Sequence, residues 1–246
     1  MTTKSFICGA ILLSMPLLLP APSFAQVTVG TARPYTGNCL PWGCDGGSIR
    51  YEQIFASSAF PNPIDIGSLT YYKTQIVIPA PTDFAPGTYT VYFSTRTGAI
   101  DDIGDDLDAN VVGPEQLFGS FVLGGEMSGS TFTLTGTNPF LYDPNAGNLL
   151  MDVYAQSTGG PGVPTYWDVD FSNSVMARAY SGTPNPQFTP GSDGEGLVTT
   201  FAAAATTPEP STLLLLGSGL LGIVPVAGRR HRTTKGYREG PHGPTR

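Results

Sequence analysis

Carboxylates supply most of the chemistry that this sequence could perform. The segment DDIGDDLDAN, residues 101–110, holds five aspartates within eight positions. Asp106, Asp108 and Asn110 repeat the D-x-D-x-N opening of calcium loops, and a hard cation prefers such oxygens on a flexible loop. The glycine and glutamate that would continue an EF-hand are missing at the following positions. Calcium binding by these three residues is therefore one hypothesis, and a solvated acidic loop or helical turn is the other.

A second pair of acids stands beside a large aromatic residue. In YWDVDF, Asp168 and Asp170 follow Trp167, whose ring could stack on a sugar face. Two carboxylates suffice for glycoside hydrolysis, but residues two apart on a strand lie closer than catalytic pairs usually do, and an exposed strand face beside a core tryptophan is the simpler interpretation. Glycan binding without catalysis, through Trp42, Trp167 and the tyrosines, is the stronger alternative.

The distribution of histidine excludes several enzyme classes. Both histidines, His231 and His242, lie near the C-terminus, so residues 26–206 contain none. Ser-His-Asp hydrolysis, Cys-His proteolysis and His-ligated zinc or copper sites are therefore excluded for that segment. Lys73 is its only lysine, and no Ser-Lys motif surrounds it. We expect this segment to be no enzyme and to need no cofactor, with calcium as the one alternative.

Short alternating stretches must position these residues. TYTVYFSTR places Tyr89, Val91 and Phe93 on one face of a strand and polar residues on the other. Similar runs between Gly/Pro turns occur at residues 50–55, 69–78, 116–123, 131–135, 149–156, 166–171, 175–180 and 197–201. Only ASSAF, residues 56–60, and the Asp-rich stretch could form a helical turn. The pattern predicts an all-β fold, a single antiparallel β-sandwich that is jelly-roll-like.

The charge of residues 26–206 excludes another class of function. Five basic residues stand against seventeen acidic ones, which gives this segment a net charge of −12. A surface this acidic repels phosphate backbones and anionic lipid headgroups. Nucleic-acid binding is therefore not expected.

The N-terminus has the order of parts found in a secretory signal peptide. Lys4 precedes a mostly apolar stretch, residues 6–19, and the small-residue pattern Ser23-Phe24-Ala25 follows it. We expect residues 1–25 to be cleaved and the mature chain to begin at or near Gln26. An N-terminal membrane anchor is the alternative, but prolines interrupt this short stretch.

Two cysteines remain after the signal peptide, Cys39 and Cys44 in NCLPWGCDGG. An even count in an exported domain indicates a disulfide. Closing so short a loop stabilises the fold by roughly 2 kcal/mol, so the bond should fix a local hairpin only. A redox or metal pair is the alternative, but the spacing is not C-x-x-C and no further ligand is near.

An uncharged apolar run occupies residues 212–228. As a helix it would be roughly 25 Å long, near the lower limit for crossing a bilayer. Arg229, Arg230 and Arg232 follow directly, so the positive-inside rule places the polar tail, residues 233–246, in the cytoplasm and the preceding domain outside. A buried core helix would not explain why the cations gather on one side.

The tripeptide Pro208-Glu209-Pro210 stands directly before this run. Its prolines keep the backbone extended and accessible to a processing enzyme. Together, the tripeptide, the short apolar span and the arginine cluster in residues 207–232 resemble the PEP-CTERM sorting signal of bacterial exported proteins. That resemblance implies recognition of Pro208, Glu209 and Pro210 by an exosortase, a membrane-embedded cysteine transpeptidase or protease. The polar tail is longer than the family's usual ending.

The domain itself is similar to a group of small PEP-CTERM proteins with no assigned activity, through RYEQIFASSAF and FLYDPNAGNLLMDVYAQ. This resemblance implies no catalytic or ligand residues. The resemblance of residues 207–232 to the PEP-CTERM sorting signal implies an association with exopolysaccharide and surface assembly. We therefore expect an ectodomain at residues 26–206 that is exported across the inner membrane, anchored by the helix 212–228, and then displayed at the cell surface or in the extracellular matrix after processing.

Overall fold

The computed structural model describes residues 25–44, 47–75, 81–183 and 190–205. The chain divides into two units, residues 1–205 and 206–246, and the described residues all belong to the first. The expected signal peptide, sorting tripeptide, apolar helix 212–228 and arginine cluster lie outside the described residues. Among the residues that are described, no helix has the length and apolarity that crossing a membrane requires.

The described chain is built almost entirely from strands, as the alternating stretches predicted. They are β1 Gln26–Val29, β2 Ser48–Phe55, β3 Ile64–Tyr72, β4 Asp83–Arg96, β5 Gln116–Glu126, β6 Thr131–Tyr142, β7 Asn148–Ser157, β8 Val169–Asp170, β9 Met176–Thr183, β10 Gly191–Asp193, β11 Gly196–Leu197 and β12 Thr199–Ala203. Helical structure in the described ranges is confined to single turns, η1 Ser57–Ala59, η2 Ile100–Asp102, η3 Pro144–Ala146 and α1 Leu107–Asn110. The predicted helical turns in ASSAF and in the Asp-rich stretch are confirmed.

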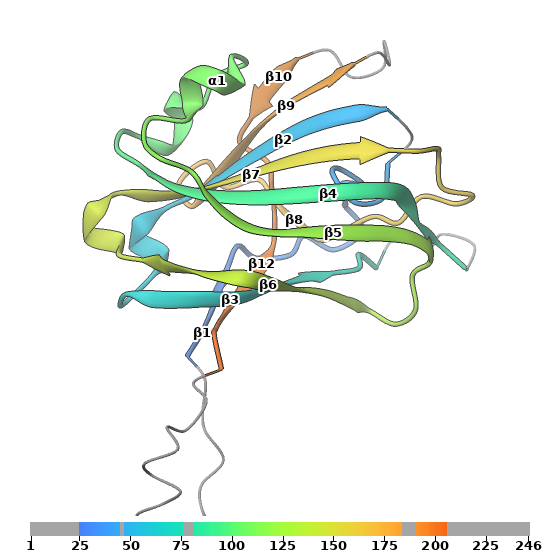
Figure 1. Cartoon of the computed structure of the whole chain (residues 1–246), viewed down its shortest axis with the longest axis horizontal. Coiled ribbons are helices and arrows are strands. Elements are labelled where there is room, and N and C mark those ends of the chain that lie inside the picture. Colours follow the sequence, from blue (N-terminus) through green and yellow to red (C-terminus); the bar gives the residue numbers. More distant parts are fainter. Residues whose placement is uncertain (1–24, 45–46, 76–80, 184–189, 206–246) are drawn as a thin grey trace, which may run out of the picture. The chain divides into compact units, whose positions relative to one another are not determined.

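Two antiparallel sheets stack face to face (Figure 1). One has the order β1-β12-β3-β6 and the other β10-β9-β2-β7-β4-β5, while β8 and β11 form a separate two-stranded ladder. Without β9 and β10, the second sheet reads β2-β7-β4-β5, and the eight remaining strands have the order of a jelly roll. β5 and β6, the neighbouring edges of the two sheets, lie side by side. The all-β expectation is confirmed.

Aromatic side chains fill the space between the sheets. Tyr89, Val91 and Phe93 on β4 are fully buried there, as the alternation of this strand predicted. Phe55 on β2 meets Phe201 on β12 edge to face, with ring centroids 4.9 Å apart, so the core joins the two sheets directly.

The connection between β4 and β5, residues 97–115, folds over the outer face of the six-stranded sheet. We call it the cover segment; it contains η2 and α1, which both contact β9, and Figure 1 shows α1 next to β9 and β10. Its Ile100, Ile103 and Leu107 pack on outward-facing residues of the sheet in a second, small core. The sheet residues of this core are Ile54, Leu150, Ala177 and Ala179. The Asp-rich stretch is thus the polar side of a segment anchored by its apolar residues.

The structure extends the strand predictions at several places. β6 continues to Tyr142, well beyond residue 135, and its pairing with β3 shifts register between Ile66 and Ser68. β1 and β10 were not predicted, because strands of four and three residues give too short an alternation to detect. β1 pairs along its length with β12, from Gln26 opposite Ala202 to Val29 opposite Thr199. The start and the end of the sandwich are therefore neighbours.

Candidate functional site

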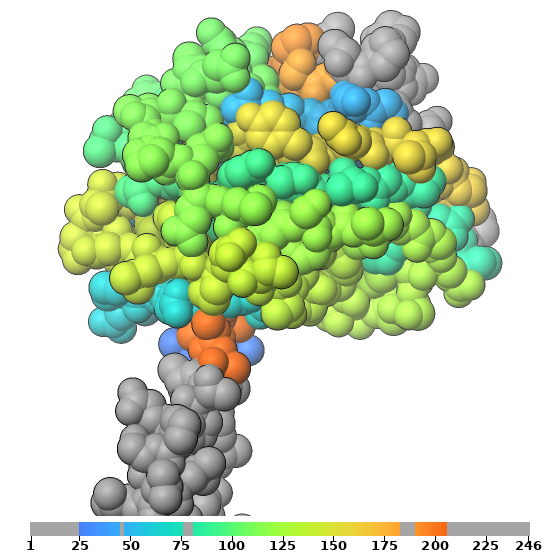
Figure 2. Space-filling view, viewed as in Figure 1, coloured from blue at the N-terminus to red at the C-terminus, as the bar shows by residue number. Residues whose placement is uncertain are grey.

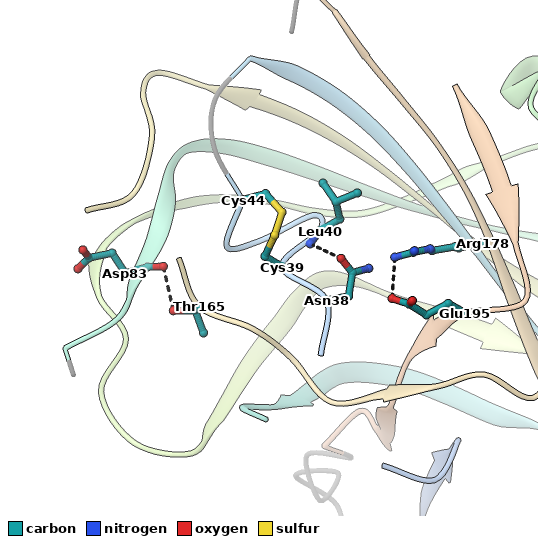
Figure 3. The surroundings of a disulfide bond; sticks show 8 residues. All are labelled: Asn38, Cys39, Leu40, Cys44, Asp83, Thr165, Arg178 and Glu195. Atoms are coloured by element: carbon teal, nitrogen blue, oxygen red, sulfur yellow. Dashed lines mark hydrogen bonds and ion pairs between the residues drawn. A yellow bond between two sulfur atoms is a disulfide. The ribbon is translucent and has the colours of Figure 1, made fainter. Parts of the chain in front are cut away.

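The predicted disulfide between Cys39 and Cys44 is present, with the two Cα atoms 4.9 Å apart (Figure 3). Within its loop, the Gly43 N–H donates to the Cys39 carbonyl at 2.7 Å. A side chain at Gly43 would collide with the Thr165 carbonyl, because a Cβ there would lie 2.1 Å from that oxygen. The closed loop therefore packs tightly against the segment before β8.

The disulfide loop positions Trp42 in the core. Trp42 is fully buried and lies 5.4 Å from the ring of Tyr71 and 5.3 Å from that of Tyr89. Trp167 is also fully buried, 5.6 Å from Phe132. The expectation that these two tryptophans form a sugar-stacking platform is wrong, because no ligand can reach rings with no exposed surface.

The structure gives Asp170 a structural role. One of its carboxylate oxygens accepts the Thr31 N–H at 2.7 Å and the other accepts the Ser172 N–H at 2.8 Å. Burial raises the pKa of Asp168, which lies beside Thr74. Asp170 thus ties the segment after β1 to β8, and Trp167 stands in the core rather than beside an open sugar site.

Asp106, Asp108 and Asn110 each bond to a different group. Asp106 caps α1 by accepting the Ala109 N–H, while the exposed Asp108 pairs with Arg50 on β2. Asn110 is buried, and its amide donates to Glu52 at 2.7 Å. Across the described ranges, no group of three or more His, Cys, Asp or Glu side chains could hold a metal ion. Calcium binding at these residues stays an untested prediction without support from their arrangement.

A polar cluster under the cover segment was not predicted. Its centre is Arg50, whose guanidinium binds Asp152 on the neighbouring strand through Nε and Nη2, the shortest distance being 2.7 Å. The same guanidinium lies 3.0 Å from Glu52 Oε1. Nη2 also donates to the Leu107 carbonyl at 3.3 Å, so this one side chain links β2, β7 and the cover segment.

The carboxyl groups of this cluster hold protons more tightly than free ones do. Burial, followed by the nearby Asp152 carboxylate, raises the pKa of Glu52 to about 8. Burial and Asp152 likewise raise the pKa of Glu115 to about 7. Burial raises the pKa of Asp152 too, against the opposing effect of Arg50. Glu52 is fully buried, and its carboxyl group already contacts Asn110 and Arg50.

An open cleft of about 380 Å³ lies beside this cluster. The cover segment forms one wall with Asp105, Asp106 and Asp108, and β2, β7 and β9 form the floor with Arg50 and Tyr154. Ser48, Ile49, Leu107, Ala155, Gln156 and Ser181 complete the lining. In Figure 2, blue β2 and yellow β7 reach the surface between the green cover segment and orange β9 and β10. The size and polar lining of the cleft are compatible with a small polar ligand.

One sequence signal pointed toward the floor of this cleft. Arg50 and Glu52 alternate with apolar residues on β2, as Asp152 and Tyr154 do on β7. Alternation assigns these residues to one face of each strand. It does not reveal that Glu52 lies opposite Asp152 and Arg50 opposite Tyr154, because that register joins strands about a hundred residues apart.

Residues 206–232 match the PEP-CTERM protein-sorting motif. The chain carries a PEP-CTERM sorting motif. The match includes Pro208, Glu209 and Pro210 and ends with the arginine cluster, Arg229, Arg230 and Arg232. No curated protein matches the chain's sequence. The PEP-CTERM match therefore concerns the sorting segment alone and says nothing about what the sandwich binds.

Proposed function

We propose that this chain is an exported PEP-CTERM protein whose sandwich is displayed at the cell surface or in the extracellular matrix and has no catalytic activity of its own. The sorting-motif match at residues 206–232 carries the proposal. In it, the signal peptide directs export, the apolar helix holds the chain in the membrane, and an exosortase recognises the PEP tripeptide.

Two features of the domain favour a role without catalysis. Residues 26–206 contain no histidine. The most strongly perturbed carboxyl group, that of Glu52, is fully buried and already paired with Asn110 and Arg50. Perturbed carboxyl groups often indicate catalysis, but a group without solvent access cannot meet a substrate.

The sorting proposal is tested by Glu209→Ala in a strain that possesses an exosortase. Because the substitution removes the one charged group of the tripeptide, we expect the unprocessed form to accumulate in the membrane fraction on immunoblots. Glu239→Ala is the matched control, since Glu239 lies beyond the matched residues and its loss should leave processing unchanged. Normal processing of Glu209→Ala, or intact precursor in the cytosol, would contradict the proposal.

Glycan binding is a second candidate function, and surface polysaccharide would then be a partner. The observation that favours it is the open cleft, because Tyr154 is the one aromatic among its lining residues and is 37% exposed. The buried tryptophans contribute nothing to this candidate. Glycoside hydrolysis by Asp168 and Asp170 gains no support, because backbone N–H groups already occupy both oxygens of Asp170.

A further inference from the structure

We propose that the cleft between the cover segment and strands β2, β7 and β9 binds an uncharged or amine-bearing sugar unit of a polysaccharide, and discriminates against acidic sugars. This inference rests on the second candidate function above and does not depend on sorting. Its principal contacts would be Asp105, Asp106 and Tyr154, which all line the cleft.

The groups in the cleft are those that recognise a polyol. Its floor contains two neighbouring rows, Ser181–Arg50–Tyr154 and Ser48–Gln156, which follow from the strand register. These rows offer hydroxyl, amide and phenol groups, and the wall adds carboxylates that can accept hydrogen bonds from sugar hydroxyls. The volume of about 380 Å³ falls within the range of small-molecule sites.

The side chains of the cleft are held in place before any ligand arrives. The ring of Tyr154 lies edge to face with Tyr92, 5.7 Å between centroids, and the Arg50 guanidinium covers it at 4.9 Å. Asp105 accepts a hydrogen bond from the Ser192 hydroxyl at 2.7 Å. Side chains fixed in this way lose little conformational freedom on binding, which favours affinity.

The charge of the cleft determines which sugars it admits. Asp105, Asp106 and Asp108 line it, and among the described lining residues Arg50 is the only cation. That cation is already paired with Asp152 and Asp108, so its attraction for the carboxylate of a ligand is weakened. A uronate would meet uncompensated negative charge, whereas a neutral sugar would not and an amine would be attracted.

Two other cavities in the described residues fit this ligand less well. A cavity of about 150 Å³ beside Asp193 is smaller than typical ligand sites. Another of about 360 Å³, beside Gly136, is lined by small residues and has neither a charged nor an aromatic side chain. Only the cleft beside Arg50 combines size, an accessible ring and hydrogen-bonding groups.

The test measures binding of full-length protein in detergent to neutral gluco-oligosaccharides, chitosan oligomers and oligouronates of equal length. We expect binding to at least one of the first two, and affinity for the uronates at least about tenfold weaker. Tyr154→Ala should weaken binding about tenfold. Tyr35→Ala is the matched control, because Tyr35 is 73% exposed and does not line the cleft, so its loss should leave binding unchanged.

Further variants separate a lost contact from a lost fold. Tyr154→Phe keeps the ring and should keep most of the affinity, and Asp105→Asn should relax discrimination against uronates, whereas Asp65→Asn on the other sheet should not. The proposal is overturned if no neutral or amine-bearing oligomer binds, if uronates bind equally well, or if Tyr154→Ala, with an unchanged melting temperature, binds like the wild type. Failure of sorting would appear only in the fractionation of Glu209→Ala.

Discussion

At the scale of single residues, Arg50 organises the outer face of the six-stranded sheet. It contacts Asp152, Glu52 and Asp108 at once and also reaches the Leu107 carbonyl. More carboxyl groups than cations share this small region, and burial together with their mutual repulsion raises the pKa of Glu52, Glu115 and Asp152. The stability of the sandwich should therefore depend on pH in a direction opposite to the usual one for proteins with paired carboxylates.

The first prediction follows from Glu52 and Glu115, whose folded-state pKa values are raised to about 8 and about 7. An unfolded chain releases these protons near pH 4.5, whereas the folded domain retains them, so the free energy of unfolding should fall as pH rises from about 4.5 to about 8. For the buried Glu52, each unit of raised pKa corresponds to roughly 1.4 kcal/mol, and the half-exposed Glu115 contributes less because solvent screens it. Urea unfolding at a series of pH values measures this slope.

Glu52→Gln should flatten that slope, because glutamine keeps the shape of the side chain and one acceptor oxygen but has no proton to lose. Glu126→Gln, at an exposed position on β5, should leave the slope as it is in the wild type. A wild-type stability that does not change between pH 5 and pH 8, or an undiminished slope in Glu52→Gln, would show that the cluster is not protonated in the fold.

A second prediction at this scale concerns calcium. Asp106 caps α1, Asp108 pairs with Arg50 and Asn110 bonds to Glu52, so their oxygens do not offer a common site. We expect the melting temperature to stay unchanged in millimolar calcium. A clear rise that disappears in Asp106→Asn would restore the calcium hypothesis, because a ligand that binds only the folded state must stabilise it.

At the scale of elements, the disulfide loop and the cover segment are anchored to the sandwich in the same way. Each is an irregular connection that is held against the sandwich by buried apolar residues, Trp42 in the loop and Ile100, Ile103 and Leu107 in the cover segment. The loop contributes to the core between the sheets, and the cover segment shields the outer face. Neither is a strand, yet each covers part of a sheet surface and keeps solvent away from it.

The third prediction separates the disulfide from the residue that it positions. The double variant Cys39→Ser, Cys44→Ser should remain folded and lose roughly 2 kcal/mol of unfolding free energy, because the closed loop is short. Trp42→Ala should cost more, about 3–5 kcal/mol, because it empties a large space in the core. Chemical denaturation of both variants checks this order. A larger loss of unfolding free energy from the double serine variant than from Trp42→Ala would show that the disulfide stabilises the domain more than Trp42 does.

At the scale of the whole molecule, the two ends of the sandwich meet. The Ala203 N–H donates to the Ala25 carbonyl at 2.9 Å, and the Ala204 N–H donates to the Asp65 carbonyl at 2.7 Å. Within the described residues, this pairing reaches Ala204, and the sorting-motif match begins at residue 206.

The fourth prediction follows from this division. Removing residues 206–246 should leave the melting temperature of the domain unchanged, because no described core residue is lost. Truncation after Leu197 should prevent folding, because it removes β12, which lies between β1 and β3 and carries the buried Phe201. Circular dichroism and thermal unfolding distinguish the two forms. A strongly destabilised 1–205 form would mean that the tail contributes to the fold.

The sequence by itself determined the features that depend on local order. Alternation along β4 and β7 predicted strands, because successive side chains of a strand point to opposite faces whatever lies around them. The even number of cysteines left after the signal peptide predicted the disulfide between Cys39 and Cys44. The order of tripeptide, apolar run and arginines predicted the sorting motif.

Only the tertiary structure decided which faces are covered and which residues meet across strands. Alternation places Glu52 and Arg50 on one face of β2, but whether that face meets solvent depends on a distant connection that happens to fold over it. The burial of Trp42 and Trp167 and the pairing of Arg50 with Asp152 were decided in the same way. Local periodicity specifies a direction for each side chain, whereas its neighbours are set by strand register and packing between residues far apart in the chain.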